Sequence, residues 1–203
     1  MTGKQLVTGP SIEPVSLNEM KAHLRVFGSE EDGLLAGYIL SARRHIEIET
    51  GRALISQRWR ATFDGGWPVA FDGVGFRTRV VLPVAPLLAI QSVQYIDSAG
   101  ATQTLSSGLY RVARVADRRQ RGFIEPAHGA SWPAVQSVAE AVSVTFDAGY
   151  GTGPGDVEGE ITQAILLLAA HWYENREAVV IGTTVSEMPL AVERLISRYR
   201  LDI

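Results

Sequence analysis

Residues 142–173 read VSVTFDAGYGTGPGDVEGEITQAILLLAAHWY, and the change of periodicity within this stretch decides the fold class. In residues 142–148 apolar and polar side chains alternate, which is the period of two typical of a half-buried β-strand. A glycine-rich linker, Gly149–Gly155, follows, and a helix is predicted from about Val157. The stretch therefore predicts that a β-rich region ends here and a helical region begins.

The predicted helix is apolar over most of its surface and carries no formal charge between Ile161 and Tyr173. A first face has apolar residues at helical spacing, and further apolar residues populate the other faces: Ile161, Ala164, Ile165, Leu168 and Trp172 on the first, Leu166, Leu167 and Ala170 on the rest. A helix that is apolar all round must be covered on several sides. Two interpretations stay open: the chain covers this helix by itself, or a neighbouring subunit covers part of it.

Two more helices are predicted before the β-rich region. Ser16 and Glu19 have the spacing of a capping box, which begins a short helix ending near Arg25. Ser29 is expected to cap the second helix, with three acids in its first turn, where they complement the helix dipole. Gly51 is its expected C-cap. The acids are Glu30, Glu31 and Asp32, and the apolar stripe is Leu35, Ile39, Ala42 and Ile46.

A last helix is predicted from Pro189, which suits the first helical position. Its inward face would hold Val192, Leu195, Ile196 and Tyr199. A mobile segment is expected before it, at residues 178–188.

Between the first and last helices, residues 53–148 read as short strands and turns. Strands are expected at 58–63, 79–82, 91–96, 102–105, 110–115, 122–125 and 142–148, with hairpins at 91–105 and 110–125. The predicted fold class is α+β. N- and C-terminal helices form a helical core, about residues 14–51 and 157–200, with a β-rich insertion, about residues 52–150, in a single domain spanning 1–203.

Composition excludes several classes of protein. The net charge of −3 gives no global attraction to nucleic acid or to an anionic membrane. The chain has no cysteine, which excludes disulfides, cysteine-ligated zinc and iron–sulfur clusters and fits a reducing cytoplasm. Met1–Pro14 lacks a secretory signal pattern, and the apolar helix is shorter than the ~20 residues that cross a bilayer. No membrane partner is expected.

The residues that could carry chemistry have simpler explanations. His128 and Ser131 lie close together, but the surrounding GASWP lacks the second glycine of a nucleophile elbow, and a structural loop anchored by Trp132 is favoured. Gly149–Gly155 lacks the Gly-Lys-Ser/Thr ending of a phosphate-binding loop. The four histidines form no i, i+3 or i, i+4 pair. No catalytic residue, cofactor site or metal site is predicted, and the chain is not expected to be an enzyme.

One charge cluster lies in the second predicted hairpin. Five arginines between Arg111 and Arg121 stand against Asp117 alone, a local charge of +4. The cluster is either a solvated turn or a contact with DNA backbone or an acidic partner, since arginines neutralise phosphates without reading sequence. The contact residues would be Arg118, Arg119 and Arg121.

Several segments together resemble one family. They are EDGLL (31–35), ETGRALI (49–55), PAHGASWP (126–133), FDAGYG (146–151) and HWYENREAV (171–179), with the helix from Ile161, Gly182-Thr183, Glu187-Met188-Pro189 and a last helix ending near Tyr199-Arg200. In this order they resemble the head–tail connector (adaptor) proteins of tailed bacteriophages and gene transfer agents. The likeness covers nearly the whole chain.

The resemblance implies a structural role. Its members form a dodecameric ring between the portal protein and the stopper or tail-completion protein, made in the bacterial cytoplasm and located in the neck of the particle. The ring extends the channel through which double-stranded DNA passes without sequence-specific binding. In the family the last helix docks on the portal, so the portal-binding residues would be Arg194, Arg198, Tyr199, Arg200 and Leu201. The rival interpretations are another neck or tail-completion protein and a DNA-binding or hydrolytic accessory factor.

Overall fold

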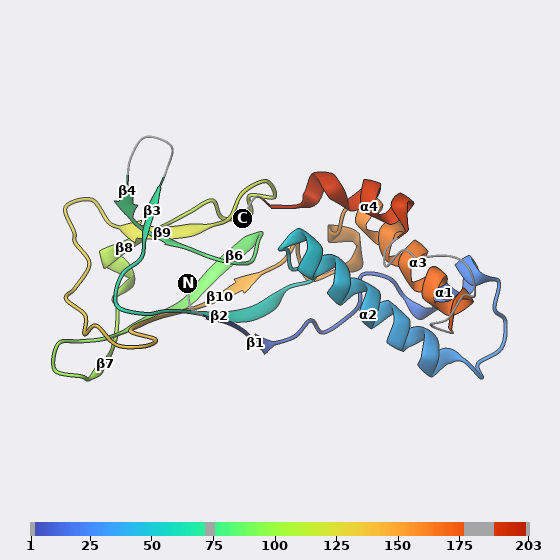
Figure 1. Ribbon diagram of the computed structural model, residues 1–203, viewed down its shortest axis with the longest axis horizontal. Coiled ribbons are helices and arrows are strands. Elements are labelled where there is room, and N and C mark those ends of the chain that lie inside the picture. Colours follow the sequence, from blue (N-terminus) through green and yellow to red (C-terminus); the bar gives the residue numbers. More distant parts are fainter. Residues whose placement is uncertain (1–2, 72–75, 177–188, 202–203) are drawn as a thin grey trace, which may run out of the picture. The chain divides into compact units, whose positions relative to one another are not determined.

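The computed structural model describes residues 3–71, 76–176 and 189–201. The chain is mixed α and β and divides into two compact units. Residues 1–10 and 56–150 form the first, here called the β unit, and residues 11–55 and 151–203 form the second, here called the helical unit. Strands β1–β10 belong to the β unit and helices α1–α4 to the helical unit (Figure 1). The segment 178–188, where we expected mobility, lies outside the described residues.

The helical unit is built on α2 (Asp32–Thr50) and α3 (Gly159–Glu174), which pack against each other. Helix α1 (Leu17–Leu24) contacts both, and α4 (Leu190–Ile196) packs on α3 and continues into the 3-10 turn η3 (Ser197–Tyr199). A further 3-10 turn, η2 (Pro154–Asp156), precedes α3. The core includes the predicted stripe of α2 and four of the five residues of the first face of α3: Leu35, Ile39, Ala42, Ile46, Ile161, Ala164, Ile165 and Leu168 are buried.

The helix ends follow local chemistry, with one correction. The capping box is confirmed: the Ser16 hydroxyl accepts from the Glu19 amide, and the Glu19 carboxylate accepts from the Ser16 amide. Gly51 is confirmed as the C-cap of α2, at φ 70°. The prediction that Ser29 caps α2 is wrong. The helix begins at Asp32 with Glu31 as N-cap, and residues 29–32 form a turn closed by the Asp32 amide on the Ser29 carbonyl.

Helix α3 is covered unevenly by its own chain. Four residues of its first face are buried, whereas Trp172 on the same face is half-buried, as are Leu166, Leu167 and Ala170. Helix α4 begins one residue later than predicted, because Pro189 is its N-cap. Val192 and Ile196 on its inward face are buried, and Leu195 is half-buried.

The β unit contains a five-stranded antiparallel sheet in the order β1-β2-β10-β6-β7. Its strands are β1 (Gly3–Thr8), β2 (Gln57–Phe63), β10 (Val142–Ala148), β6 (Leu87–Ile96) and β7 (Thr102–Thr104). A three-stranded sheet has the order β5-β9-β8, with β5 (Val80–Val81), β9 (Phe123–Pro126) and β8 (Tyr110–Ala113), and the 3-10 turn η1 (Ser107–Leu109) precedes β8. Strands β3 (Val69–Phe71) and β4 (Phe76–Thr78) form a third, two-stranded sheet.

The central strand β10 fixes which face of the large sheet is buried. The predicted alternation is confirmed: Val142, Val144, Phe146 and Ala148 are buried, and the residues between them are half-exposed. Strand β2 pairs with β10 in continuous register, whereas the pairing of β6 with β10 shifts register twice. On the opposite, polar face Asp147 lies beside Arg58. The two carboxylate oxygens of Asp147 accept from Arg58 at 2.8 and 3.2 Å.

Both predicted hairpins are confirmed, as β6–β7 and β8–β9. Three strands were not predicted: β1, β3 and β4. β1 is an edge strand with five of its six residues exposed, so burial imposes no alternation on its sequence.

Candidate interaction surfaces

The residues predicted to bind the portal are held within the helical unit. Leu201 is buried, and its amide donates to the Thr50 carbonyl at 3.1 Å. Arg52 Nε donates to the Tyr199 carbonyl, and the Tyr199 hydroxyl donates to Glu160 at 2.9 Å. These contacts attach the end of the chain to the C-terminal end of α2 and the start of α3.

Two exposed arginines of this end form ion pairs. Arg198 pairs with Glu160, and Arg200 pairs with Glu49 at 2.9 Å. Hydrogen bonds from its own backbone amide and from the Tyr199 hydroxyl lower the pKa of Glu160, and the charge of Arg198 adds to this. Arg194 is also exposed. The C-terminal end therefore has a structural role in the helical unit and still presents guanidinium groups on its surface.

The loop between β8 and β9 is fixed by backbone contacts. The Ala116 amide donates to the Leu87 carbonyl at 2.7 Å, and Asp117 Oδ1 accepts from the amides of Arg119 and Gln120. A side chain at Gly122 would overlap Leu87, so this position requires glycine. The loop thus presents its arginines from an ordered backbone.

The arginines of this loop differ in their surroundings. Arg118 and Arg119 are exposed, and the Arg118 guanidinium lies 5.1 Å from the centre of the Tyr150 ring. Arg121 is half-buried, and its Nε is buried and lacks a hydrogen-bond partner. A buried donor without an acceptor costs about 1–3 kcal/mol, so Arg121 is the member of the cluster whose surroundings favour an incoming acceptor.

Arg121 lines a pocket of about 250 Å³ together with Arg79. The other walls are apolar and include Phe63, Val81, Leu82 and Pro83. The Arg79 guanidinium lies 4.8 Å from the centre of the Phe123 ring, and that of Arg114 lies 5.2 Å from the same ring. We call this the arginine pocket. Its chemistry suits a group that is both apolar and negatively charged.

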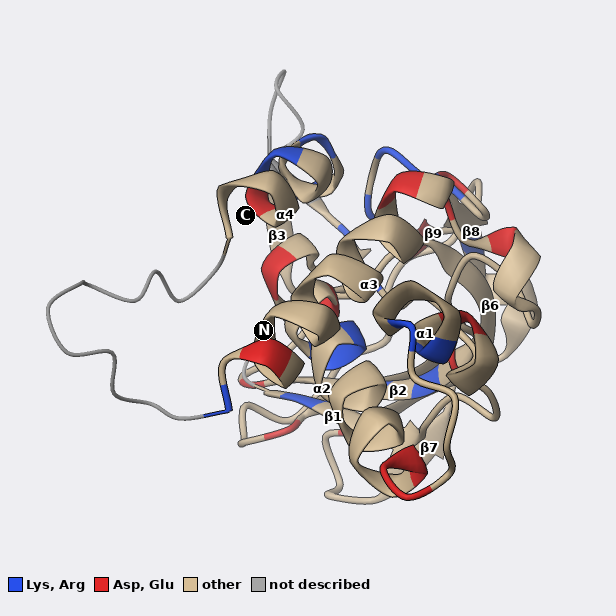
Figure 2. Cartoon of the chain, turned by 90° about the vertical axis from the view of Figure 1, so that its right-hand side faces the viewer, with Lys and Arg blue, Asp and Glu red and all other residues tan. Residues whose placement is uncertain are grey.

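The two units carry opposite net charges. The β unit has ten Lys and Arg residues against seven Asp and Glu, a net charge of +3. The helical unit has nine against fifteen, a net charge of −6. The charged residues are coloured in Figure 2. The overall charge of −3 thus conceals a basic unit and an acidic one.

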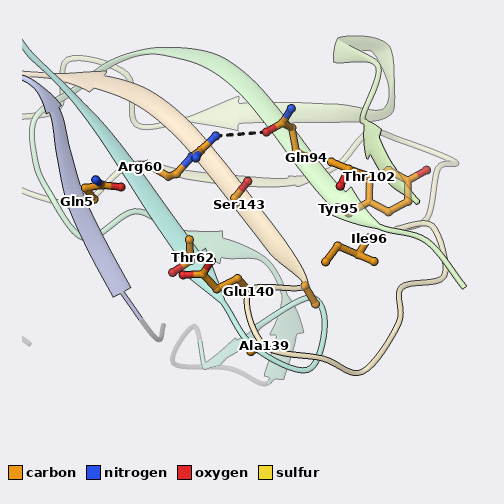
Figure 3. Close-up of a pocket in the computed structure, with 11 residues that line it drawn as sticks. Gln5, Arg60, Thr62, Gln94, Tyr95, Ile96, Thr102, Ala139, Glu140 and Ser143 are labelled. Carbon is orange, nitrogen blue, oxygen red and sulfur yellow. Dashed lines mark hydrogen bonds between the residues drawn. The ribbon is translucent and has the colours of Figure 1, made fainter. Parts of the chain in front are cut away.

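The polar face of the large sheet contains a second hollow, of about 300 Å³ (Figure 3). Its lining is mostly amide, hydroxyl and charged side chains, among them Gln5, Arg60, Thr62, Gln94 and Ser143. Arg60 reaches Gln94 at 3.5 Å, drawn as the dashed line in the figure. The hollow is therefore lined mainly by polar groups.

An exposed aromatic residue lies in the loop between α1 and α2. The side chain of Phe27 is 95% exposed. Glu30 is also exposed, and its carboxylate folds back beside Gly28, where a Cβ atom would overlap it. Glu31, next in the chain, accepts hydrogen bonds from Tyr173 and Arg176, which lower its pKa and hold the C-terminal side of the loop against α3.

The loop that contains His128 and Ser131 is held by the predicted Trp132, which stacks on Trp67. The rings of Trp67 and Trp132 stack with centroids 4.1 Å apart, and Trp132 Nε1 donates to the Thr78 carbonyl at 3.1 Å. His128 and Ser131 are both exposed. Across residues 3–71, 76–176 and 189–201, no group of three or more His, Asp or Glu residues could hold a metal ion. Over the same residues, no helix is long and apolar enough to cross a membrane.

Sequence reasoning missed three features of these surfaces. Arg79 was assigned to a strand, and only the folded sheet brings it to the pocket of Arg121. The opposite charges of the units could have been found by summing charges over each predicted region. The isolated aromatic residue in the turn at 27–28 was visible in the sequence, but its exposure was not.

One family model matches the chain. The family model described as phage gp6-like head–tail connector protein matches residues 14–75 and 133–200. No curated protein matches the sequence.

Among solved structures, one similar chain is from the virion of a native gene transfer agent particle, with 27% identity, a TM-score of 0.77, and coverage of 100% of this chain and 97% of the other. A second is from the neck of an empty gene transfer agent particle computed with C6 symmetry, at 26% identity, TM-score 0.78 and the same coverage. A third, from the neck of a native particle computed with C12 symmetry, has 26% identity, TM-score 0.70 and coverage of 98% and 96%. The family match spans more than half of the chain, and the chain belongs to the phage gp6-like head–tail connector family.

Proposed function

We propose that this chain is the structural adaptor of a phage or phage-like particle and forms a ring in the neck, between the portal and the stopper or tail-completion protein. The observation that carries the proposal is the similarity over 98% of the chain to a protein of a neck computed with C12 symmetry. A cyclic ring of twelve copies around the DNA channel is the assembly that such symmetry suits. In this assembly the chain acts as one adaptor domain, with a helical core and a β-rich insertion.

The role is mechanical and not catalytic. The ring connects two protein layers and extends a channel through which double-stranded DNA passes without sequence-specific binding. An acidic helical unit of net charge −6 supports such a role if it lines the channel, because it would not retain phosphates.

The portal contact is proposed at the C-terminal end. Arg194, Arg198 and Arg200 are exposed and supply donors for carboxylates of the portal, while Leu201 and the Tyr199 backbone hold the end of the chain in place. Replacing Arg194 and Arg198 by Ala should preserve folding, since exposed substitutions change stability by about 0.5 kcal/mol or less. DNA-filled heads without tails should then accumulate. Tailed heads at the normal frequency would place the portal contact elsewhere.

The arginine loop is proposed to contact an acidic protein surface. Apolar walls and the buried Nε of Arg121 favour a carboxylate on a side chain over the phosphate of a rigid duplex. Replacing Arg118, Arg119 and Arg121 together by Ala should leave a folded protein and reduce the yield of complete particles. A normal particle yield from the folded triple variant would show that the loop is a solvated turn without a partner contact.

The neck position is tested by reconstructing the neck from particles. Density for this chain as a closed ring next to the portal is expected. Density at the tail end of the neck, away from the portal, would identify the chain as a tail-completion protein, and absence from the particle would refute the structural role.

A further inference from the structure

We infer that neighbouring copies of this chain are joined by the insertion of Phe27 and Glu30 of one copy into the arginine pocket of the next, a contact that rests on the proposed ring. The two halves are a loop of the helical unit and a pocket of the β unit, so each copy carries both.

The first half is the loop between α1 and α2. A phenylalanine exposed to 95% has no place in the core of its own chain, and burying it removes a large apolar area from water. Three residues further on, Glu30 is exposed, with its carboxylate beside Gly28. The loop therefore presents an aromatic ring and a negative charge within four consecutive residues. Glu31 is tied to Tyr173 and Arg176, which keeps the base of the loop in place.

The second half is the arginine pocket. At about 250 Å³ it has the volume for one aromatic side chain and part of a second group. Its apolar walls, such as Phe63 and Leu82, suit a ring. Guanidinium groups stack on aromatic faces, and the Arg79 guanidinium already lies over Phe123. Arg121, whose Nε lacks an acceptor, would pair with the carboxylate of Glu30.

Charge and symmetry favour a second copy over another kind of partner. In a cyclic ring every copy meets its neighbour through two different surfaces, which must be complementary. The β unit of net charge +3 and the helical unit of net charge −6 supply surfaces of opposite sign in the same chain. In a head-to-tail ring, the β unit of one copy would attract the helical unit of the next, and this attraction adds to each contact. Contacts between two β units or between two helical units would be repulsive.

Because the chain has no cysteine, a thiol introduced by mutation is the only thiol in the chain, and a cross-link can be assigned to that position. The Ser29→Cys and Val69→Cys variants place one thiol beside Phe27 and one at the pocket, both on exposed residues. Particles that contain both single-cysteine variants should yield a covalent dimer with a short bis-maleimide. Particles with either variant alone should yield none, since like positions are not in contact. The double variant should yield a ladder of higher oligomers.

The side chains are tested in the same particles. Phe27→Ala should lower cross-linking at least about tenfold, the scale expected when a central aromatic anchor is removed. Ile48→Ala is the matched control, because Ile48 is also an exposed apolar residue, on α2, and should leave cross-linking unchanged. Glu30→Arg and Arg121→Glu should each reduce cross-linking, and the two changes combined should restore it.

The outcomes separate the contact from the proposed function. Particles that contain the chain as a ring but give no mixed dimer would overturn the contact and leave the adaptor role intact. Dimers from one single-cysteine variant alone would overturn it as well, because they show contact between like surfaces. Cross-linking of residue 69 to a cysteine of another neck protein would assign the pocket to that partner instead. A chain absent from the particles would overturn both proposals.

Discussion

The ion pairs of Arg43 provide the sharpest test of what holds the helical unit together. The Arg43 side chain is 4% exposed and contacts two carboxylates, Glu13 at 2.6 Å and Glu47 at 2.6 Å. Glu47 also accepts from the amide of Leu54 at 2.8 Å, where the chain leaves α2. Burial opposes the charge of Arg43, but the hydrogen bond to Glu13 and the charges of both carboxylates keep its pKa above the ordinary value. Arg43 thus joins α2 to the segment before α1.

The Arg43→Met variant keeps the apolar stem and removes the guanidinium group that contacts both carboxylates. Removing one partner of a buried ion pair costs about 3–5 kcal/mol, because the remaining charge is desolvated without compensation. Glu47 is the more buried of the two acids, at 10% side-chain exposure, so most of this cost falls on it. For a chain of this size, each kcal/mol lowers Tm by roughly 2–4 °C, which predicts a shift of roughly 10 °C.

The assay compares this variant with one in which Arg43→Met is combined with Glu13→Gln and Glu47→Gln. The glutamine at 47 retains an acceptor for the Leu54 amide, and both carboxylate charges that Arg43 contacts are removed. Denaturant unfolding followed by far-UV circular dichroism should show most of the lost stability recovered in the triple variant. A single variant that loses less than about 1 kcal/mol, or a triple variant no more stable than the single one, would refute the reasoning.

The remaining predictions concern the ends and loops of the two units. Leu201→Ala should destabilise the protein by about 2 kcal/mol, measured as a lower denaturant midpoint, because Leu201 is buried and its truncation leaves a cavity; an unchanged midpoint would contradict this. Glu31 has a pKa held below 4.5 by Tyr173 and Arg176, so its stabilisation is present above pH 4.5 and is lost as the pH falls through the folded pKa. The stability difference between wild type and Glu31→Gln should therefore shrink between about pH 6 and pH 3, and a constant difference would show that the contact is not ionic. Trp132→Ala should cost at least about 1 kcal/mol and remove the near-UV signal of the stacked pair with Trp67; an unchanged spectrum would mean that the rings do not stack in solution.

Much of the fold could be predicted because local chemistry and the tertiary structure agree there. The capping box at Ser16, the C-cap at Gly51 and the alternation of β10 each act within a few residues. The start of α2 was predicted wrongly because a tertiary contact lies beside Ser29. Glu31, the N-cap in the structure, accepts hydrogen bonds from Tyr173 and Arg176, which lie far away in the chain. Likewise the exposed edge strand β1 is specified by pairing with β2, and its own sequence carries no burial pattern.

Some features of the candidate surfaces also follow from the sequence alone, and others follow only from the tertiary structure. The sequence by itself determined the arginine cluster, the absence of cysteine and the family, because these depend on residue identity and order. The tertiary structure decided which arginine lies in a pocket, since Arg79 and Arg121 are 42 positions apart and meet only when β5 pairs with β9. It also decided that Leu201 is buried against the end of α2 and that Phe27 is left in solvent. Burial is a property of packing between distant segments, and neither periodicity nor composition contains it.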